Sequence, residues 1–134
     1  MSTFVLLLSG GNQVIVLGGH EFEGPVPLDE WGRNGRPSGI YAICRREQAG
    51  AARVRWRPLF IGELVDATWP GFPRSHPAGP WWAATAGGWE RLGIAFHPMP
   101  APDPRHRASV VRLLVDTLRP RCNGSFDYRP DRRG

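Results

Sequence analysis

The residues of this chain best suited to chemistry are its arginines, which are grouped along the sequence. All 17 basic residues are arginine, with seven in residues 33–57 and five in residues 119–134. Grouped guanidinium groups attract phosphates by Coulomb forces and by counterion release, as nucleic-acid binding requires. The first group predicts a basic face on the loop or hairpin that joins two strand-like runs, formed by Arg45, Arg46, Arg53, Arg55 and Arg57. A solvated loop and a solvated tail are the alternative interpretation of the same charges.

Other reactive side chains are scattered. The histidines have none of the spacings of a helical or hairpin metal site, and only His76 is a candidate phosphate contact. By its position in a proline-rich loop, Arg74 is typical of a solvated surface arginine. Tyr41 lies in an apolar run, which is typical of a half-buried core tyrosine. Trp81 and Trp82 could stack bases or anchor a partner, but in such adjacent pairs we expect one buried and one half-exposed ring.

Length and composition limit the class of protein. A chain of 134 residues with 41% hydrophobic and 22% charged residues fits one compact domain with a packed core. No apolar run approaches the roughly 20 residues that span a bilayer, so we expect no membrane association. Cys44 and Cys122 cannot build a disulfide framework or a four-cysteine zinc site, which indicates reduced thiols in the cytoplasm.

The elements that must position these side chains are mainly short strands. Runs of β-prone residues bounded by turn residues occur at 3–8, 13–17, 39–44, 59–63 and 91–97. The first two predict a hairpin. Residues 18–37 are rich in glycine, proline and acids and predict a long surface loop. Strands first and a helix late favour an α+β fold, with a small mixed or antiparallel sheet flanked by helices.

Two helices are predicted. Residues 81–86 predict a short helix ended by Gly87-Gly88, after a proline-rich stretch at 65–80 that disfavours regular helix. Residues 105–119 predict a longer one, capped by Asp103 and stopped by Pro120. Its apolar stripe consists of Val111, Leu114, Val115 and Leu118.

Two tripeptides on neighbouring predicted strands form a pair, Gly39-Ile40-Tyr41 and Phe60-Ile61-Gly62. The chain then ends its long helix in Leu118-Arg119-Pro120-Arg121-Cys122-Asn123. In order and span these segments resemble the GIY-YIG nucleases, which include excision-repair nucleases, homing endonucleases and some restriction enzymes. The resemblance implies one GIY-YIG-like domain over residues 1–123, with its motif region at 39–123, an N-terminal hairpin extension and a basic tail at 124–134. Its structural motif residues are Gly39, Phe60, Gly62 and Asn123.

The resemblance also implies a catalytic site. Tyr41 matches the tyrosine that activates the attacking water or acts as a base, and Phe60 replaces the second tyrosine without its hydroxyl. Arg74 falls near the arginine that binds the scissile phosphate, and His76 follows it. The candidate catalytic residues are therefore Tyr41, Arg74 and His76, and a bound cation would complete the stabilisation of phosphate charge.

The metal ligand of that family is missing. Counting back from Asn123 places the metal-binding glutamate at or near Val111. We expect Val111 on the helix stripe that faces the sheet carrying Tyr41, so that a glutamate there would stand opposite Tyr41 and Arg74. Glu63 and Glu90 are candidate substitutes, because a hard cation needs a carboxylate ligand. We expect no certain metal site, Mg²⁺ only if the chain is active, and weakened or lost cleavage in a protein that binds DNA or RNA. The alternative is an inactive domain that serves as a protein-interaction module or a small subunit of a larger complex.

Overall fold

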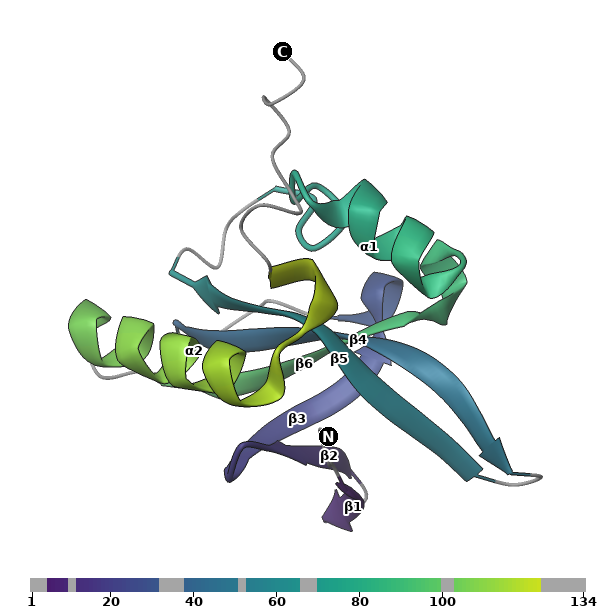
Figure 1. Ribbon diagram of the computed structural model, residues 1–134, viewed down its shortest axis with the longest axis horizontal. Helices are drawn as coiled ribbons and strands as arrows, with labels where there is room; N and C mark the ends of the chain where they lie inside the picture. The colour runs from purple at the N-terminus through teal and green to yellow at the C-terminus, as the bar shows by residue number, and fades with distance from the viewer. Residues whose placement is uncertain are drawn as a thin grey trace.

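The computed structural model describes residues 5–9, 12–31, 38–50, 53–65, 70–99 and 103–123. They form a six-stranded antiparallel sheet in the order β1-β2-β3-β6-β4-β5, with two α-helices (Figure 1). The expected α+β fold with an antiparallel sheet and flanking helices is confirmed. The strands are β1 (Val5–Ser9), β2 (Asn12–Leu17), β3 (His20–Pro27), β4 (Gly39–Gly50), β5 (Arg53–Leu64) and β6 (Leu92–Pro98). The helices are α1 (Gly79–Ala86) and α2 (Pro104–Leu118), with short 3-10 turns η1 (Leu28–Glu30), η2 (Trp89–Arg91) and η3 (Arg121–Asn123).

Strand β4 lies between β5 and β6, and its first half, residues 39–44, is buried on both faces. This burial explains why the first half is a continuous apolar run. Because side chains alternate across a strand, Tyr41 and Ile43 face one core, whereas Ile40 and Ala42 face the other. The two faces of β4 therefore belong to two separate hydrophobic cores.

The first core lies between the sheet and α1. Trp82 is fully buried there, with Leu59 from β5 and Phe96 from β6. The helix ends at Gly87, whose φ of 92° is left-handed and whose amide donates to the Ala83 carbonyl. The short helix predicted for residues 81–86 is confirmed, and the preceding proline-rich residues 70–78 form turns.

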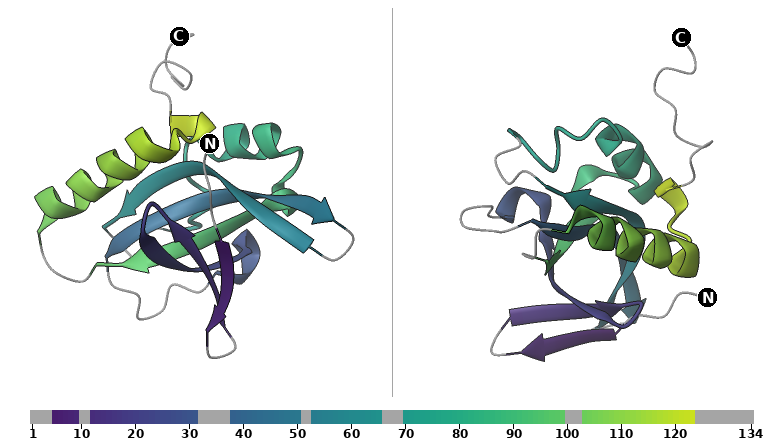
Figure 2. Two further views of the ribbon diagram at one scale, coloured as in Figure 1. Left: turned by 60° about the horizontal axis from the view of Figure 1, so that its bottom comes forward. Right: turned by 90° about the vertical axis from the view of Figure 1, so that its left-hand side faces the viewer.

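The second core lies between the opposite sheet face and α2. The Asp103 carboxylate accepts hydrogen bonds from the amides of Arg105 and His106, so the predicted cap is confirmed. Leu114 from the predicted stripe is buried in this core, with Val111, Val115 and Leu118 packed around it. In the right-hand view of Figure 2, α1 lies at the top and the β1–β2 hairpin, at one end of the curled sheet, lies at the bottom.

The curled sheet brings the turn between β2 and β3 against α2. At Gly18, with φ of 55°, an added Cβ would meet the Leu114 side chain at 2.5 Å. This turn needs glycine for its backbone and for the close approach of the helix. The hairpin predicted from residues 3–8 and 13–17 is confirmed for the part that the structure describes, where β1 pairs with β2.

The long loop predicted for residues 18–37 is wrong in its first half. Residues 20–27 form β3, with alternating exposed and buried side chains. The register shifts between Glu23 and Val26, and this irregularity accommodates Pro25, which has no amide to donate. Gly18 and Gly19 form a two-residue turn, and Gly24 and Pro25 lie at a bulge, so these residues do not mark a loop.

The arginine-rich segment between the first two motif strands is a long hairpin. Strands β4 and β5 extend to Gly50 and from Arg53, well beyond the predicted runs at 39–44 and 59–63. The predicted tail at 124–134 lies outside the described residues, as does the Arg53 side chain. Within the described ranges, neither helix has the length and apolar composition needed to cross a bilayer.

Candidate nucleic-acid interface

A pocket of about 880 Å³ opens where the β4–β5 hairpin, α1 and the chain after α2 meet. Four arginines and one glutamate line it, which gives its wall three net positive charges. The lining residues are Arg45, Glu47, Arg57, Pro58, Leu59, Trp81, Ala84, Thr85, Leu118, Arg119 and Arg121. Both arginine-rich segments of the sequence contribute to this pocket, although more than 60 residues separate them.

The hairpin arginines of the pocket are placed by strand register. Arg45 lies directly opposite Arg57, and Glu47 lies opposite Arg55, so these four side chains share one face of the hairpin. A register shift between Ile43 and Cys44 sets this pairing. Arg57 therefore contacts Glu47 with its Nε at 2.9 Å, and Arg45 approaches the same carboxylate at 3.9 Å.

Of the remaining two hairpin arginines, Arg46 does not join this face. Arg46 lies opposite Trp56, whose side chain is in the second core, so Arg46 is on the other face of the hairpin. Arg53 pairs with Gly50 through the backbone, and its side chain is outside the described set. The predicted band thus contributes Arg45 and Arg57 to the pocket and leaves Arg55 exposed beside it.

The arginines after α2 are held in place by Asn123. Its side-chain oxygen accepts from the Ile61 amide at 2.7 Å, and its side-chain nitrogen donates to the Ile61 carbonyl at 3.0 Å. Since β5 is the last strand of the sheet, this contact fastens η3 to an open sheet edge. The buried Cys122 supports it by donating weakly to Thr85 of α1 at 3.7 Å. Asn123 therefore bridges the end of α2 to strand β5.

Arg119 is positioned by the end of the helix itself. Its φ of 52° is left-handed, and its amide donates to the Val115 carbonyl at 2.8 Å. Among the described residues, neither Arg119 nor Arg121 has a carboxylate within ion-pair distance. Among the residues that line the pocket, Glu47 offsets charge on the hairpin side and no acid does so on the α2 side.

The tyrosine expected to act in catalysis is a core residue. Tyr41 is 2% exposed, and its ring contacts Phe72 and Phe60 with centroid separations of 4.9 and 6.1 Å. A Cβ on Gly62, its cross-strand partner, would lie 2.5 Å from the Tyr41 hydroxyl oxygen, so the glycine makes room for the ring. Burial raises the pKa of the Tyr41 hydroxyl far above its usual range. The hydroxyl stays protonated at neutral pH and is unsuited to act as a base.

His76 lies at the margin of the same aromatic cluster. Its ring is 5.3 Å from Phe60 and 4.8 Å from Trp82 between centroids, and its Nδ1 accepts from the Ala78 amide at 2.9 Å. Burial lowers the pKa of His76, which favours the neutral ring. The structure thus brings Tyr41, Phe60 and His76 together, but in a packed cluster whose histidine stabilises a turn.

Arg74 has a different set of contacts. Its guanidinium forms a two-point ion pair with Asp29, at 2.9 Å from Nε and 3.2 Å from Nη2, and it lies 4.8 Å from the centre of the Trp89 ring. The contacts join the turn after Gly71 to η1 and η2. None of the three candidate catalytic residues lines the arginine pocket.

The stripe of α2 does face the sheet, but the expectation that a side chain at Val111 stands opposite Tyr41 is wrong. Val111 packs against the second core, which includes Ile40 and Ile61, whereas Tyr41 belongs to the first core on the opposite face. The helical stripe was predicted correctly, but α2 covers the other side of the sheet from α1. A glutamate at Val111 would not stand opposite Tyr41.

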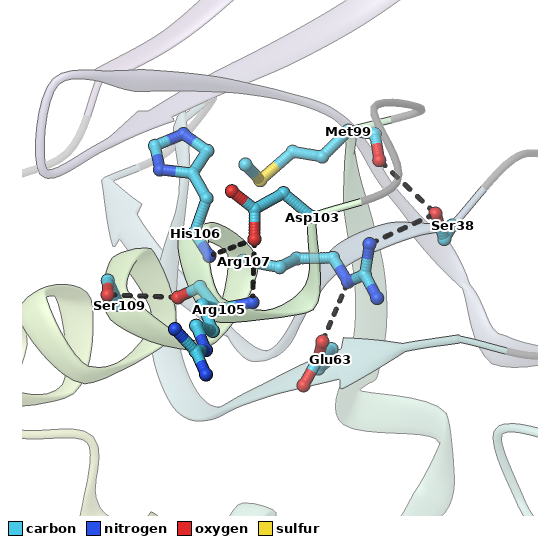
Figure 3. Close-up of polar contacts among 8 residues, drawn as sticks. All are labelled: Ser38, Glu63, Met99, Asp103, Arg105, His106, Arg107 and Ser109. Atoms are coloured by element: carbon cyan, nitrogen blue, oxygen red, sulfur yellow. Dashed lines mark hydrogen bonds and ion pairs between the residues drawn. The ribbon is translucent and has the colours of Figure 1, made fainter.

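Glu63, one of the two candidate substitutes for the missing metal ligand, forms an ion pair with Arg107 of α2 (Figure 3). Its Oε2 lies 2.7 Å from Nε of Arg107, a residue only 5% exposed, and Nη1 of Arg107 donates to the Ser38 hydroxyl at 3.3 Å. The pair joins the first turn of α2 to the ends of β4 and β5. In the part of the chain that the structure describes, no three histidine, cysteine or acidic side chains are grouped to hold a metal ion.

Comparison with known proteins gives no match: no family model fits the chain, and no curated protein or solved structure is significantly similar to it. Sequence reasoning singled out Trp81 as a candidate for stacking bases, but it missed the pocket residues Glu47, Thr85, Arg119 and Arg121. The second arginine group could have pointed to Arg119 and Arg121. The spacing of two residues between Arg45 and Glu47, which places both on one face of a strand, could have pointed to Glu47.

Proposed function

We propose that this protein binds nucleic acid through the arginine pocket. The observation that carries the proposal is the meeting of two arginine-rich segments, distant in sequence, around one cavity with three net positive charges. Phosphates are the anions that match this charge, and a polymer of phosphates also reaches the exposed Arg55 beside the pocket. Arg119 and Arg121 supply the principal phosphate contacts, since Glu47 competes for Arg57 and Arg45.

A relationship to the GIY-YIG domain is part of this proposal. Its support is the contact between the three motif segments. Tyr41 of the first motif lies opposite Gly62 of the second on two adjacent strands, and Asn123 bonds to the backbone of Ile61, the middle residue of the second motif. The ring of Phe60 packs near Tyr41, where the family has a second tyrosine. The motifs then serve to build the fold that positions the pocket.

In this proposal the protein binds nucleic acid and does not cleave it. The buried Tyr41 hydroxyl, the Asp29 partner of Arg74 and the Arg107 partner of Glu63 each support this assignment. A phosphate seated among the pocket arginines would contact none of the three candidate catalytic side chains. The polymer is DNA or RNA, and the pocket contacts its backbone.

The test is binding of a fluorescent oligonucleotide, followed by anisotropy between about 50 and 200 mM salt. Replacing both Arg119 and Arg121 with glutamine should weaken binding at every sequence and lower the salt slope by about 0.7–0.9 per lost contact. The matched control is Arg112→Gln, an exposed arginine of α2 that does not line the pocket. Unchanged binding by the double variant, or an equal loss in the control, would refute the proposal, and copurification of a protein without nucleic-acid affinity would favour an interaction module.

A further inference from the structure

The arginine pocket has a second, apolar wall. Leu59 and Pro58 from β5, Trp81 from α1 and Leu118 from α2 line it together with the arginines. Of the two adjacent tryptophans, Trp82 is fully buried in the first core, whereas Trp81 is half-buried and reaches the pocket. The cavity therefore offers an aromatic side chain and positive charge within the same enclosure.

The pocket is large enough to take a base as well as the phosphates of the backbone. Its volume of about 880 Å³ is in the range of about 300–1,000 Å³ that small-molecule sites occupy. Phosphate contacts alone need only a charged surface, and they leave the apolar wall unused. Thr85 adds a hydroxyl that accepts from Cys122, so its own proton can be donated into the pocket.

We infer that the pocket seats an unpaired nucleotide of a single strand, with its base against Trp81 and its phosphates at Arg119 and Arg121. This inference rests on the proposed function and names its substrate class. A base can enter such a cavity only when it is unstacked and unpaired, which a duplex resists. Aromatic side chains beside a basic track are the usual means of holding single strands without sequence preference.

The experiment compares three probes of matched phosphate number: a single-stranded oligonucleotide, an abasic strand with the same backbone, and a short duplex. Base–aromatic stacking of about 1–3 kcal/mol per base corresponds to about 5- to 150-fold tighter binding of the base-bearing strand than of the abasic strand. We expect this preference in the unaltered protein, together with weaker binding of the duplex. No variant is needed for this comparison.

Variants then assign the preference to the aromatic wall. Trp81→Leu should abolish the advantage of the base-bearing strand while leaving abasic binding unchanged, and Trp81→Phe should retain part of it. Trp89→Phe, at a tryptophan that contacts Arg74 outside the pocket, is the control. Melting temperatures of all three variants show whether each one is folded.

The failures of the two proposals are distinguishable. Equal affinity for the base-bearing and abasic strands, tighter binding of the duplex, or a preference that survives Trp81→Leu would overturn the single-strand inference and leave nucleic-acid binding intact. Absence of binding to all three probes would overturn both.

Discussion

At the scale of single residues, Glu47 limits the charge that the pocket presents. It lies between Arg45 and Arg57 and contacts the latter at 2.9 Å. The side chains of Arg45 and Arg57 are 37% and 52% exposed, so water screens the attraction and the contact is weak. A phosphate therefore competes with this carboxylate for the hairpin arginines.

Glu47→Gln should strengthen nucleic-acid binding. Removing one negative charge frees Arg57 for a phosphate, so the salt slope should become steeper by about 0.7–0.9. Anisotropy titrations at several salt concentrations measure both effects. Glu30→Gln, at an exposed glutamate of η1 outside the pocket, should leave the slope unchanged. A weaker complex in Glu47→Gln would indicate that the carboxylate orients the arginines instead.

We expect the folded protein to lose stability in alkali because of Tyr41. Burial raises the pKa of its hydroxyl in the folded state, whereas the unfolded chain has the ordinary pKa of about 10. A raised pKa contributes stability below about pH 10, and that contribution is lost as the pH rises further, because only the unfolded chain releases the proton. Denaturant unfolding between pH 8 and 11 should show this decline.

The variant Tyr41→Phe serves as the control in two measurements, the alkaline loss of stability and the cleavage of DNA. The variant should lack the part of the alkaline loss that comes from this hydroxyl, and it should bind oligonucleotide like the unaltered protein. A protein that nicks plasmid DNA with Mg²⁺ or Mn²⁺, and loses this activity in Tyr41→Phe, would contradict binding without cleavage.

At the scale of elements, the last strand of the sheet is closed by a side chain. Asn123 bonds to both backbone groups of Ile61 in β5, as a further strand would. An open edge strand can pair with another chain, and this contact covers part of that edge. The same bonds fix η3 and with it Arg121 of the pocket.

Asn123→Ala should lower the free energy of unfolding by about 1–3 kcal/mol, because the part-buried amide and carbonyl of Ile61 lose their partners. Urea unfolding measures the change. Asn123→Asp keeps the acceptor and loses the donor, so it should also be destabilised. An unchanged midpoint in Asn123→Ala, together with altered binding, would make Asn123 a site residue rather than a structural one.

Helix α2 is joined to the sheet by charge as well as by its apolar stripe. Arg107 is buried and depends on Glu63, whose side chain is 28% exposed. Breaking a fully buried pair costs about 3–5 kcal/mol, so Glu63→Gln should cost on the order of 2 kcal/mol after allowance for that exposure. In a double-mutant cycle, Glu63→Leu with Arg107→Met should cost less than the sum of the single changes. Additive effects in denaturant unfolding would show that the two side chains act independently.

At the scale of the whole molecule, charge is separated along the chain and then gathered in space. Residues 1–32 carry four acids and no base, whereas the arginine-rich segments at 33–57 and 119–134 carry most of the positive charge. The fold brings members of both segments to one pocket, where a shared field attracts anions more strongly than separate patches.

Association should therefore be faster at low salt. We expect the bimolecular rate constant for a single-stranded oligonucleotide to fall as salt rises, with a shallower dependence for the Arg119→Gln, Arg121→Gln double variant. Stopped-flow anisotropy measures this rate. Rates that respond equally to salt in both proteins would show that the pocket does not steer the encounter.

Much of the element structure could be predicted from the sequence, because its causes are local. Asp103, Pro104 and Pro120 bound α2 through caps and missing amides, and Gly87 ends α1. The strand at residues 20–27 was missed because Pro25 and the glycines of the preceding tight turn are residue types typical of loops. The strand that pairs with it and accommodates Pro25, β6, is distant in sequence.

The α+β class, the ends of the helices and the presence of one buried and one half-buried tryptophan could all be predicted from the sequence. The face of the sheet that each element covers could not, and it became known from the fold. This placement separates Val111 from Tyr41, commits Glu63 to Arg107, and gathers Arg45, Arg57, Arg119 and Arg121 around one pocket. The physical reason is range: caps and periodicity act over one or two turns of chain, whereas the arginine cluster depends on a register shift in β4–β5 and on Asn123 reaching a strand 62 residues away.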